Sequence, residues 1–274
     1  MTIPGLHPEW EGRRIAHLSD FQVGMWLDNP GTAARMVERL VEDRPDVVLL
    51  GGDLIYSKEP DAAAKLNTVS GIIRALPEAG IPTYAVLGNH EVELGVADRV
   101  RAALERIGVT VLSNDAVALA PPTGSEQTGP RLHLVGVAPR ENGRDRPAAA
   151  VGQVPDGAPR LVLIHDLRSF RGLPAGTAPL AVAGHTHGGQ VRLPFTPDWS
   201  WLELVSDLPA DGFVDGYGEP RNQLYVSRGV GFSVVPVRLN CRPELTVFTL
   251  RSSAGTTPAR SKASETSAGT RART

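Results

Sequence analysis

Short apolar runs that end abruptly in polar or glycine-containing turns are the main pattern along this chain. Each run consists mostly of Val, Ile, Leu and Ala, and the runs lie at residues 15–18, 47–50, 83–87, 161–164 and 180–183. Continuous hydrophobicity over so short a length is typical of strands that are covered on both faces, as in a parallel sheet. We therefore expect buried strands at these positions.

Each of the first three runs is followed by a segment in which apolar residues recur at helical spacing. One helix is expected to begin at Asn29, a favoured N-cap residue that precedes Pro30, and to continue through Val41. Two more helices are expected at about residues 61–76 and 94–107. Strands that alternate with helices predict a parallel sheet with right-handed crossovers.

The pattern changes after residue 109 to shorter strand-like pieces and long loops rich in Pro and Gly. The expected strands lie at residues 116–120, 132–137, 224–226 and 245–250, and the expected loops at 121–130 and 140–159. This order favours the α/β class, with a two-sheet α/β sandwich as the architecture. From residue 251 the chain holds almost no large apolar residue, so we expect one domain over residues 1–250 and a disordered tail over 251–274.

Composition narrows the classes of function. The chain has 274 residues, 41% of them hydrophobic, and a formal net charge of -2, so it lacks the basic surface that nucleic-acid binding usually needs. The single cysteine, Cys241, excludes an intramolecular disulfide. We find no apolar stretch that resembles a signal peptide or a transmembrane helix, and expect a cytoplasmic protein for which peripheral membrane contact stays open.

Polar turns follow each of the five apolar runs, and together they carry the candidate chemistry. His185 and His187 stand two residues apart, so in extended backbone their rings point the same way. The candidates in the other turns are Asp20, Gln22, Asp53, Asn89, His90 and His165. Because the carboxyl ends of parallel strands meet at one edge of a sheet, we expect all these side chains to converge. Such a mixture of imidazole and oxygen donors suits Mn, Fe, Zn or Co.

These turns resemble the motifs of the calcineurin-like metallophosphoesterase superfamily, D-x-H, G-D, G-N-H-[DE], H and G-H-x-H, over roughly residues 13–250. Within it, residues 184–194, 225–231 and 240–244 are similar to a bacterial branch that contains lipid-processing enzymes such as UDP-2,3-diacylglucosamine hydrolases. The resemblance implies a hydrolase that cleaves a phosphomonoester, a phosphodiester or a pyrophosphate. A lipid-linked and a nucleotide-type substrate both stay open, and no protein partner is evident.

The resemblance also implies two divalent metal ions, Mn being the first choice and Fe, Zn, Co or Mg alternatives. The implied ligands are Asp20, Gln22, Asp53 and His187 for the first ion, and Asp53, Asn89, His165 and His185 for the second. Two ions so placed would clamp the oxygens of an in-line displacement and activate a bridging water as the nucleophile. His90 would stabilise the transition state or protonate the leaving oxygen.

One position departs from the family pattern, because Gln22 stands where the first motif has histidine. A glutamine oxygen is neutral like imidazole, but it is a harder and weaker donor that shifts preference toward Mn or Mg. We therefore expect the first ion to be bound more weakly than the second, with Gln22 either a ligand or a bystander beside water. This substitution is also the only support for an alternative function, a metal-binding scaffold of the same fold that has little or no catalysis.

Several residues near the turns leave two interpretations open. Arg168, Arg192 and Arg228 could contact phosphate, since guanidinium groups match phosphate oxygens, or could form surface salt bridges. Glu91, Asp166 and Thr186 could orient ligands or simply face solvent. Aromatic residues near the first and last turns could form an apolar wall for a hydrophobic leaving group, or could pack a loop; they are Trp26, Phe195, Trp199 and Trp201. We expect the remaining histidines, His7, His17 and His133, to be structural.

Overall fold

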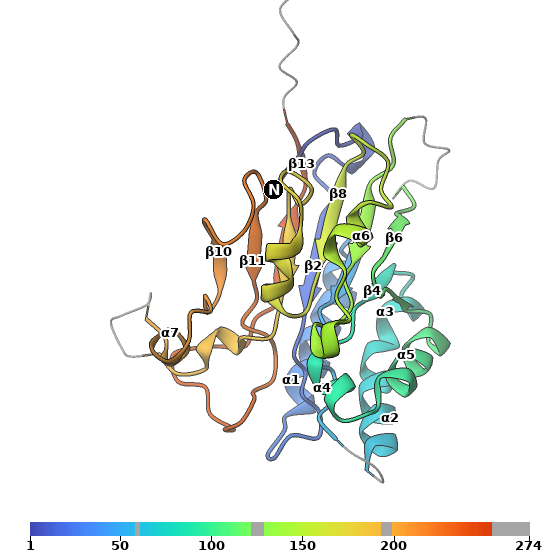
Figure 1. Cartoon of the computed structure of the whole chain (residues 1–274). Helices are drawn as coiled ribbons and strands as arrows, with labels where there is room; N and C mark the ends of the chain where they lie inside the picture. The colour runs from blue at the N-terminus through green and yellow to red at the C-terminus, as the bar shows by residue number, and fades with distance from the viewer. Residues whose placement is uncertain (58–60, 122–128, 193–198, 254–274) are drawn as a thin grey trace, which may run out of the picture.

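Two β-sheets packed face to face form the centre of the computed structural model, which describes residues 1–57, 61–121, 129–192 and 199–253 (Figure 1). The first sheet has five strands, in the spatial order β12 (Thr246–Thr249), β2 (Arg14–Leu18), β3 (Val47–Leu50), β4 (Thr83–Ala85) and β5 (Thr110–Val111). Its strands run parallel except β12, which pairs antiparallel with β2.

The second sheet has six strands and brings the other half of the chain against the first. Its spatial order is β10 (Gly212–Val214), β11 (Leu224–Val226), β9 (Ala181–Ala183), β8 (Arg160–Leu163), β7 (His133–Gly136) and β6 (Asp115–Ala118). The four central strands are parallel, and the two edge strands are antiparallel to their neighbours. A further short pair joins β1 (Thr2–Ile3) to β13 (Arg251–Ser252).

Three apolar layers hold this sandwich together. The layer between the sheets includes Ile15, Leu49, Leu134, Leu163 and Val182. Helices α1 (Pro30–Asp43), α2 (Ala62–Ile73), α3 (Ala75–Glu78) and α5 (Ala97–Arg106) cover the outer face of the five-stranded sheet (Figure 1). Helix α6 (Pro147–Val151) and the 3-10 helix η3 (Leu167–Gly172) cover the outer face of the other sheet. The central strands of both sheets are therefore buried on both faces, which explains their continuous apolar sequences.

The remaining helical elements are short. They are α4 (Asn89–Glu93), α7 (Trp201–Val205) and the 3-10 helices η1 (Pro8–Trp10), η2 (Glu141–Gly143) and η4 (His187–Gly189). Of the helices that the structure describes, none has the length and apolarity needed to cross a membrane.

The two-sheet α/β sandwich predicted from the sequence is confirmed, with three differences in detail. The five buried strands do not share one sheet: β2, β3 and β4 lie in one, and β8 and β9 in the other. The loop predicted at 140–159 contains η2 and α6, because Pro147 begins a helix that Ala148 to Ala150 continue. The first two residues of the expected tail form β13, which pairs with β1, and residues 254–274 of that tail lie outside the described residues.

Candidate metal centre

The carboxyl ends of strands from both sheets point to one end of the sandwich, and the polar turns that follow them meet there. The structure brings together every candidate ligand expected from the sequence, namely Asp20, Gln22, Asp53, Asn89, His165, His185 and His187. All of these residues are buried apart from His185, which is partly exposed. The convergence is thus a property of two sheets whose carboxyl ends meet, and not of a single sheet edge.

Left-handed backbone is the local feature that turns these side chains inward. The φ angles are 57° at Asp20, 53° at Gln22, 51° at Asp53, 76° at His185 and 51° at His187. Non-glycine residues in this region are uncommon and cost on the order of 1–3 kcal/mol each, and they persist where the surroundings enforce them. Backbone hydrogen bonds between adjacent turns do so here: the Asp20 N–H donates to the Gly52 carbonyl (2.9 Å) and the Gln22 N–H to that of Asp53 (3.0 Å).

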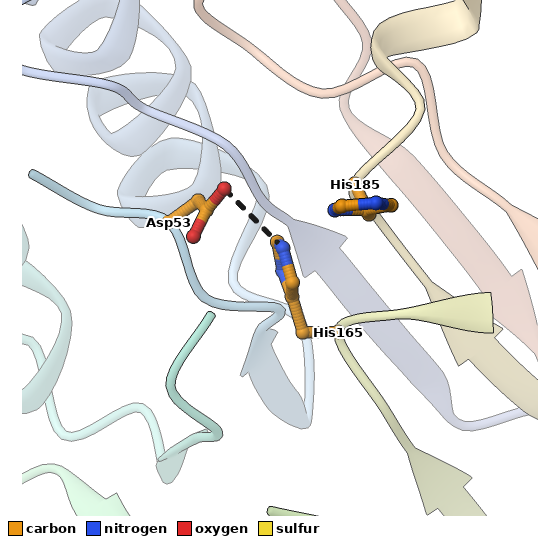
Figure 2. A group of neighbouring side chains, drawn as sticks. All are labelled: Asp53, His165 and His185. Atoms are coloured by element: carbon orange, nitrogen blue, oxygen red, sulfur yellow. Dashed lines mark ion pairs between the residues drawn. The ribbon is translucent and has the colours of Figure 1, made fainter. Parts of the chain in front are cut away.

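Asp53, His165 and His185 form a tight cluster whose potential ligand atoms all lie within 4.8 Å of one another (Figure 2). Asp53 Oδ2 lies 3.3 Å from His165 Nε2. Asn89 Oδ1 completes the set, 3.0 Å from His165 Nε2 and 2.9 Å from His185 Nδ1. His165 Nδ1 is 2.7 Å from the Gly51 carbonyl, so this nitrogen donates its proton there and leaves Nε2 facing the cluster.

The charges of this cluster match a cation. Burial lowers the pKa of His165, but the Asp53 carboxylate outweighs it and raises that pKa to about 10. The carboxylate thus favours a positive charge beside it, either a proton on His165 or a divalent ion that displaces this proton from Nε2. Burial, reinforced by the charge of His165, lowers the pKa of His185 to about 4 and keeps its ring neutral, the form that binds metals. Burial disfavours the Asp53 anion, yet His165 drives the pKa of Asp53 far below its usual range. Buried anionic oxygens beside a neutral imidazole and an amide oxygen are a fitting donor set for a divalent ion.

A second cluster lies beside the first and consists of Asp20, Gln22 and His187. His187 Nε2 is 3.5 Å from Asp20 Oδ1. The Gln22 amide nitrogen donates to Asp53 Oδ2 (3.0 Å) and lies 3.4 Å from His187 Nε2, while its oxygen Oε1 is buried without a partner among the described residues. A half-turn of the amide exchanges nitrogen and oxygen, and would present Oε1 to a cation between Asp53 and His187. The residues of this cluster therefore fit the ion called the first above, once this amide rotates.

Asp20 is held by its neighbours in the orientation that faces His187. Its Oδ2 accepts a hydrogen bond from Ser19 Oγ (2.5 Å), and the His185 N–H donates to Oδ1 (3.1 Å). Gly229, at a φ of 67°, lies so close that an added Cβ would stand 2.7 Å from Asp20 Cβ. A glycine is therefore required at this position, where the loop after β11 closes over the ligand.

Glu91 orients the two turns that carry Asp53 and Asn89. Its carboxylate accepts backbone N–H donors from Gly88 (2.7 Å), Asp53 (3.0 Å), Leu54 (2.6 Å) and Ile55 (3.2 Å). Burial, followed by the charge of Asp53, raises the pKa of Glu91 to about 7. Of the two interpretations left open for Glu91, the structure thus supports the orienting one.

The other two residues with open interpretations are also engaged. Asp166 binds the side chain of Arg168, and Thr186 donates its hydroxyl to the Ala210 carbonyl (2.6 Å). His17, expected to be structural, is fully buried in β2 beneath Gly51, where an added Cβ would lie 2.6 Å from its Nε2. It belongs to the packing under the site and not to the ligand set.

Arg238 was not predicted from the sequence, yet it braces the His187 side of the centre. Its guanidinium donates to the backbone carbonyls of His187 (3.1 Å), Arg228 (2.8 Å) and Gly231 (2.7 Å). Cys241 adds a contact of 3.4 Å from its Sγ to the His187 carbonyl. Nothing in the sequence indicates this role of Arg238. Its partners are backbone carbonyls of residues far along the chain, and every residue type has such a carbonyl.

His90 lies at the open side of the centre. Its Nε2 is 3.6 Å from Asp53 Oδ2, its Nδ1 is 3.5 Å from Glu93 Oε2, and the side chain is 16% exposed. The edge-on ring of Tyr56, with centroids 4.7 Å apart, fixes the imidazole from one side. His90 is therefore near the candidate ligands and within reach of a molecule that enters from solvent.

The three arginines considered for phosphate contact all have carboxylate partners. Arg168 Nε lies 2.9 Å from Asp166 Oδ2, and Arg192 and Arg228 both pair with Asp211. These pairs are the salt bridges left open above, and a role in phosphate binding stays a prediction. Among the aromatic candidates, Trp26 is 70% exposed, Trp201 is 56% exposed, and Phe195 lies outside the described residues.

Comparison with known proteins places this geometry in context. The family model for calcineurin-like phosphoesterases matches residues 13–189. Phosphodiesterase YaeI of Escherichia coli is 33% identical over 212 residues, which cover 77% of this chain and 72% of the relative. The uncharacterized metallophosphoesterase YkuE of Bacillus subtilis is 27% identical over 86% of this chain and 77% of its own. A solved dimetal phosphatase from Danio rerio aligns with a TM-score of 0.49 and 12% identity, over 88% of this chain and 93% of that one.

The match covers the four parallel strands β2 to β5 of the five-stranded sheet, the helices between them and the two histidine turns, so it includes every candidate ligand. The family match and the relatives therefore show that the chain belongs to the calcineurin-like phosphoesterase family and is a metal-dependent hydrolase of phosphoric ester bonds.

Proposed function

We propose that the protein is a phosphodiesterase that works with two divalent ions, of which Mn is the expected one. The position of Asp53 between the two ligand clusters is the observation that carries the proposal. Its Oδ2 lies 3.0 Å from Gln22 Nε2 on one side and 3.3 Å from His165 Nε2 on the other. A single carboxylate in this position can serve both ions. The choice of a diester is supported by the relative that is named a phosphodiesterase.

Each group of residues has a distinct part in this function. Asp20, Gln22 and His187 would hold the first ion, and Asn89, His165 and His185 the second. When bound, such a pair of ions stabilises the negative charge of the phosphate and lowers the pKa of a water molecule at the site. The protein's own contribution is to hold the donors rigidly, through the left-handed turns, Glu91 and Arg238.

His90 would act on the leaving group. Its Nε2 is close to Asp53 but is not among the candidate ligands, so its ring can hold a proton at the open side of the centre. That proton would pass to the departing oxygen of the ester, which prevents the build-up of negative charge there. The carboxylate of Glu93 lies 3.5 Å from Nδ1, on the opposite side of the ring from Nε2.

Hydrolysis of two synthetic esters tests this proposal. Metal-depleted protein reloaded with Mn²⁺ should hydrolyse bis-p-nitrophenyl phosphate faster than p-nitrophenyl phosphate. Removal of a residue that hydrogen-bonds to a metal ligand typically reduces activity by roughly ten- to hundredfold. The variants Asp53→Ala and His185→Ala remove the candidate ligands themselves, so their activity should fall by more than this. Asp115→Ala and His133→Ala, which change the same residue types on the remote strands β6 and β7, are the matched controls.

The alternative of a metal-binding scaffold predicts the opposite result in the same experiment. Full metal content without turnover of either ester would overturn the proposed function, as would turnover that Asp53→Ala leaves unchanged.

A further inference from the structure

A pocket of about 380 Å³ opens directly beside the metal centre. His185 and His187 form part of its wall, so the pocket is continuous with the candidate ligands. The remaining wall comes from three segments, with Val191 after η4, Leu202 on α7, and Val235 in the loop after β11. A molecule that fills this pocket therefore has one end at the metal centre.

The chemistry of the wall is apolar. Leu208, Trp201 and Val234 add further hydrocarbon surface to the residues just named. Gln190 and Thr186 are engaged within the protein: Gln190 Nε2 donates to the Val235 carbonyl (3.2 Å), Gln190 Oε1 accepts from the Ser233 N–H, and the Thr186 hydroxyl donates to the Ala210 carbonyl. Among the described residues of the wall, only the two histidines carry a titratable side chain. A sugar or a base would lose hydrogen bonds to water here without replacing them, whereas a hydrocarbon loses none.

The mouth of the pocket exposes apolar surface to solvent. Trp201 is 56% exposed, Val234 is 87% exposed and Val235 is 48% exposed. Clustered apolar side chains of this kind around a cavity mark a binding site for an apolar ligand. An occupant that covered them would gain free energy in proportion to the area withdrawn from water.

The wall on the α7 side is held in place before any ligand binds. Ser200 and Glu203 form a capping box at the start of α7, with Ser200 N to Glu203 Oε2 at 3.0 Å and Glu203 N to Ser200 Oγ at 3.4 Å. The Trp201 N–H donates to the Val191 carbonyl (3.0 Å), which ties the helix to the segment after η4. The cavity is thus largely preformed, which reduces the ordering cost of binding.

We propose that this pocket binds the hydrocarbon chain of the substrate, so that the natural substrate is a phosphodiester with a long alkyl or prenyl group next to the scissile phosphate. The inference rests on the proposed function, because that function places the phosphate at the metal ions. Continuity with His185 and His187 sets the direction: the phosphate lies at the ligands, and the chain extends past Val191 and Leu202 toward Trp201. A lipid-type ester is favoured over a nucleotide-type ester.

The first test compares p-nitrophenyl ethyl phosphate with p-nitrophenyl octyl phosphate, below the concentration at which the octyl ester aggregates. Each methylene withdrawn from water is worth about fourfold in binding, or about 0.8 kcal/mol. We expect kcat/KM for the octyl ester to exceed that for the ethyl ester at least tenfold. Equal values for the two esters in the wild type would overturn the proposal.

Substitutions on two separate segments of the wall test whether this pocket causes the preference for the octyl ester. Leu202→Gln and Val235→Gln each place an amide in the pocket wall, and each should reduce the octyl preference toward one while hydrolysis of the ethyl ester persists. Leu204→Gln is the matched control, because Leu204 lies on the same helix, is 60% exposed and is not part of the wall. Loss of the preference in the control but not in the wall variants would contradict the assigned site.

A binding experiment separates failure of the pocket from failure of the proposed function. Calorimetry of the Mn²⁺-loaded protein with octylphosphonate and ethylphosphonate requires no turnover. Tighter binding of the octyl compound that Leu202→Gln removes would support the pocket even if neither ester were hydrolysed, in which case only the proposed function fails. Equal affinity for both phosphonates, or binding of neither, would overturn the pocket regardless of the hydrolysis result.

Discussion

Gln22 is the residue at which this chain departs from the histidine of its family's first motif. Its side chain reaches the same place as the other candidate ligands, with its amide between Asp53 and His187. In the orientation observed, the amide nitrogen faces the Asp53 carboxylate, so the oxygen becomes available to a cation only after that hydrogen bond is broken. Binding of the first ion must therefore break this hydrogen bond. A histidine whose nitrogen facing Asp53 carries no proton would not form it.

Replacement of Gln22 by histidine should strengthen the first site. After equilibration at a free Mn²⁺ concentration between the Kd values of the two wild-type sites, followed by removal of free metal, we expect about one ion per chain in the wild type and about two in Gln22→His, measured by elemental analysis. Gln153→His, which adds a histidine far from the centre near Asn114, controls for adventitious binding. Equal and full occupancy in the wild type and in Gln22→His would show that the glutamine is no weaker as a ligand.

His17 illustrates a different residue-scale effect, on stability. Burial lowers its pKa to about 4, although Asp20 acts in the opposite direction, and neither ring nitrogen has a partner among the described residues. A histidine whose pKa is lower in the folded state opposes folding when it is protonated. Its effect is absent above about pH 6.5 and grows as the pH falls toward 4.

Removal of this ring should therefore weaken the acid sensitivity of the fold. Between pH 7.5 and pH 5, His17 alone should reduce the free energy of unfolding by about 2 kcal/mol. Denaturant unfolding of the wild type and of His17→Leu at both pH values measures the difference, and any constant effect of the substitution cancels. The prediction fails if both proteins lose the same free energy over this range.

At the scale of elements, the loop after β11 and the turn after β9 form one unit that Arg238 holds together. Arg238→Gln would remove the guanidinium donors from the carbonyls of His187, Arg228 and Gly231. We expect at least a tenfold weaker affinity for the first ion and little change at the second, whose ligands His165 and His185 make no contact with Arg238. Removal of a residue that hydrogen-bonds to a metal ligand typically weakens metal affinity by about this factor.

Titration calorimetry with Mn²⁺ resolves the two ions and measures this prediction. Arg242→Gln changes an exposed arginine of the same segment and should bind both ions as the wild type does. An equal weakening of both sites by Arg238→Gln would point instead to a general loss of structure.

At the scale of the whole molecule, the candidate metal centre links the two sheets. Asp20, Gln22, Asp53 and Asn89 follow strands of the five-stranded sheet, whereas His165, His185 and His187 follow β8 and β9 of the other. Ions that bind both sets stabilise the packed sandwich and do not bind the separated sheets in this way. Metal binding is therefore coupled to the stability of the whole domain.

Chelation of the metal should lower the thermal unfolding midpoint. A ligand at one hundred times its Kd stabilises a fold by about 2.7 kcal/mol, which for a domain of this size corresponds to about 5 to 10 °C. Calorimetric scans with Mn²⁺ and with excess chelator measure the shift. The Asp53→Ala variant should lose most of it, and an undiminished shift in that variant would exclude Asp53 as a shared ligand.

Much of the fold and of the candidate site could be predicted because the signals are local. Strands buried on both faces must be apolar along their whole length, so residues 47–50 predict β3 without error. The candidate ligands stand directly after such strands, and a turn after a strand places its side chains at the strand's end. Helix α4 was missed because it is a short helix that begins at Asn89 itself.

The sequence by itself determined the strand positions, the donor types at each strand end and the unusual glutamine, since these depend only on neighbouring residues. Only the tertiary structure decided how the strands divide between two sheets and which ligands face each other. It also decided that Arg238 braces His187 and that an apolar pocket adjoins the metal centre. These features arise from contacts between residues far apart in the chain, as with Arg238 and His187 at a separation of 51 positions. Such contacts are made by backbone carbonyls and by packed apolar side chains. Neither leaves a local sequence pattern that identifies the residue it contacts.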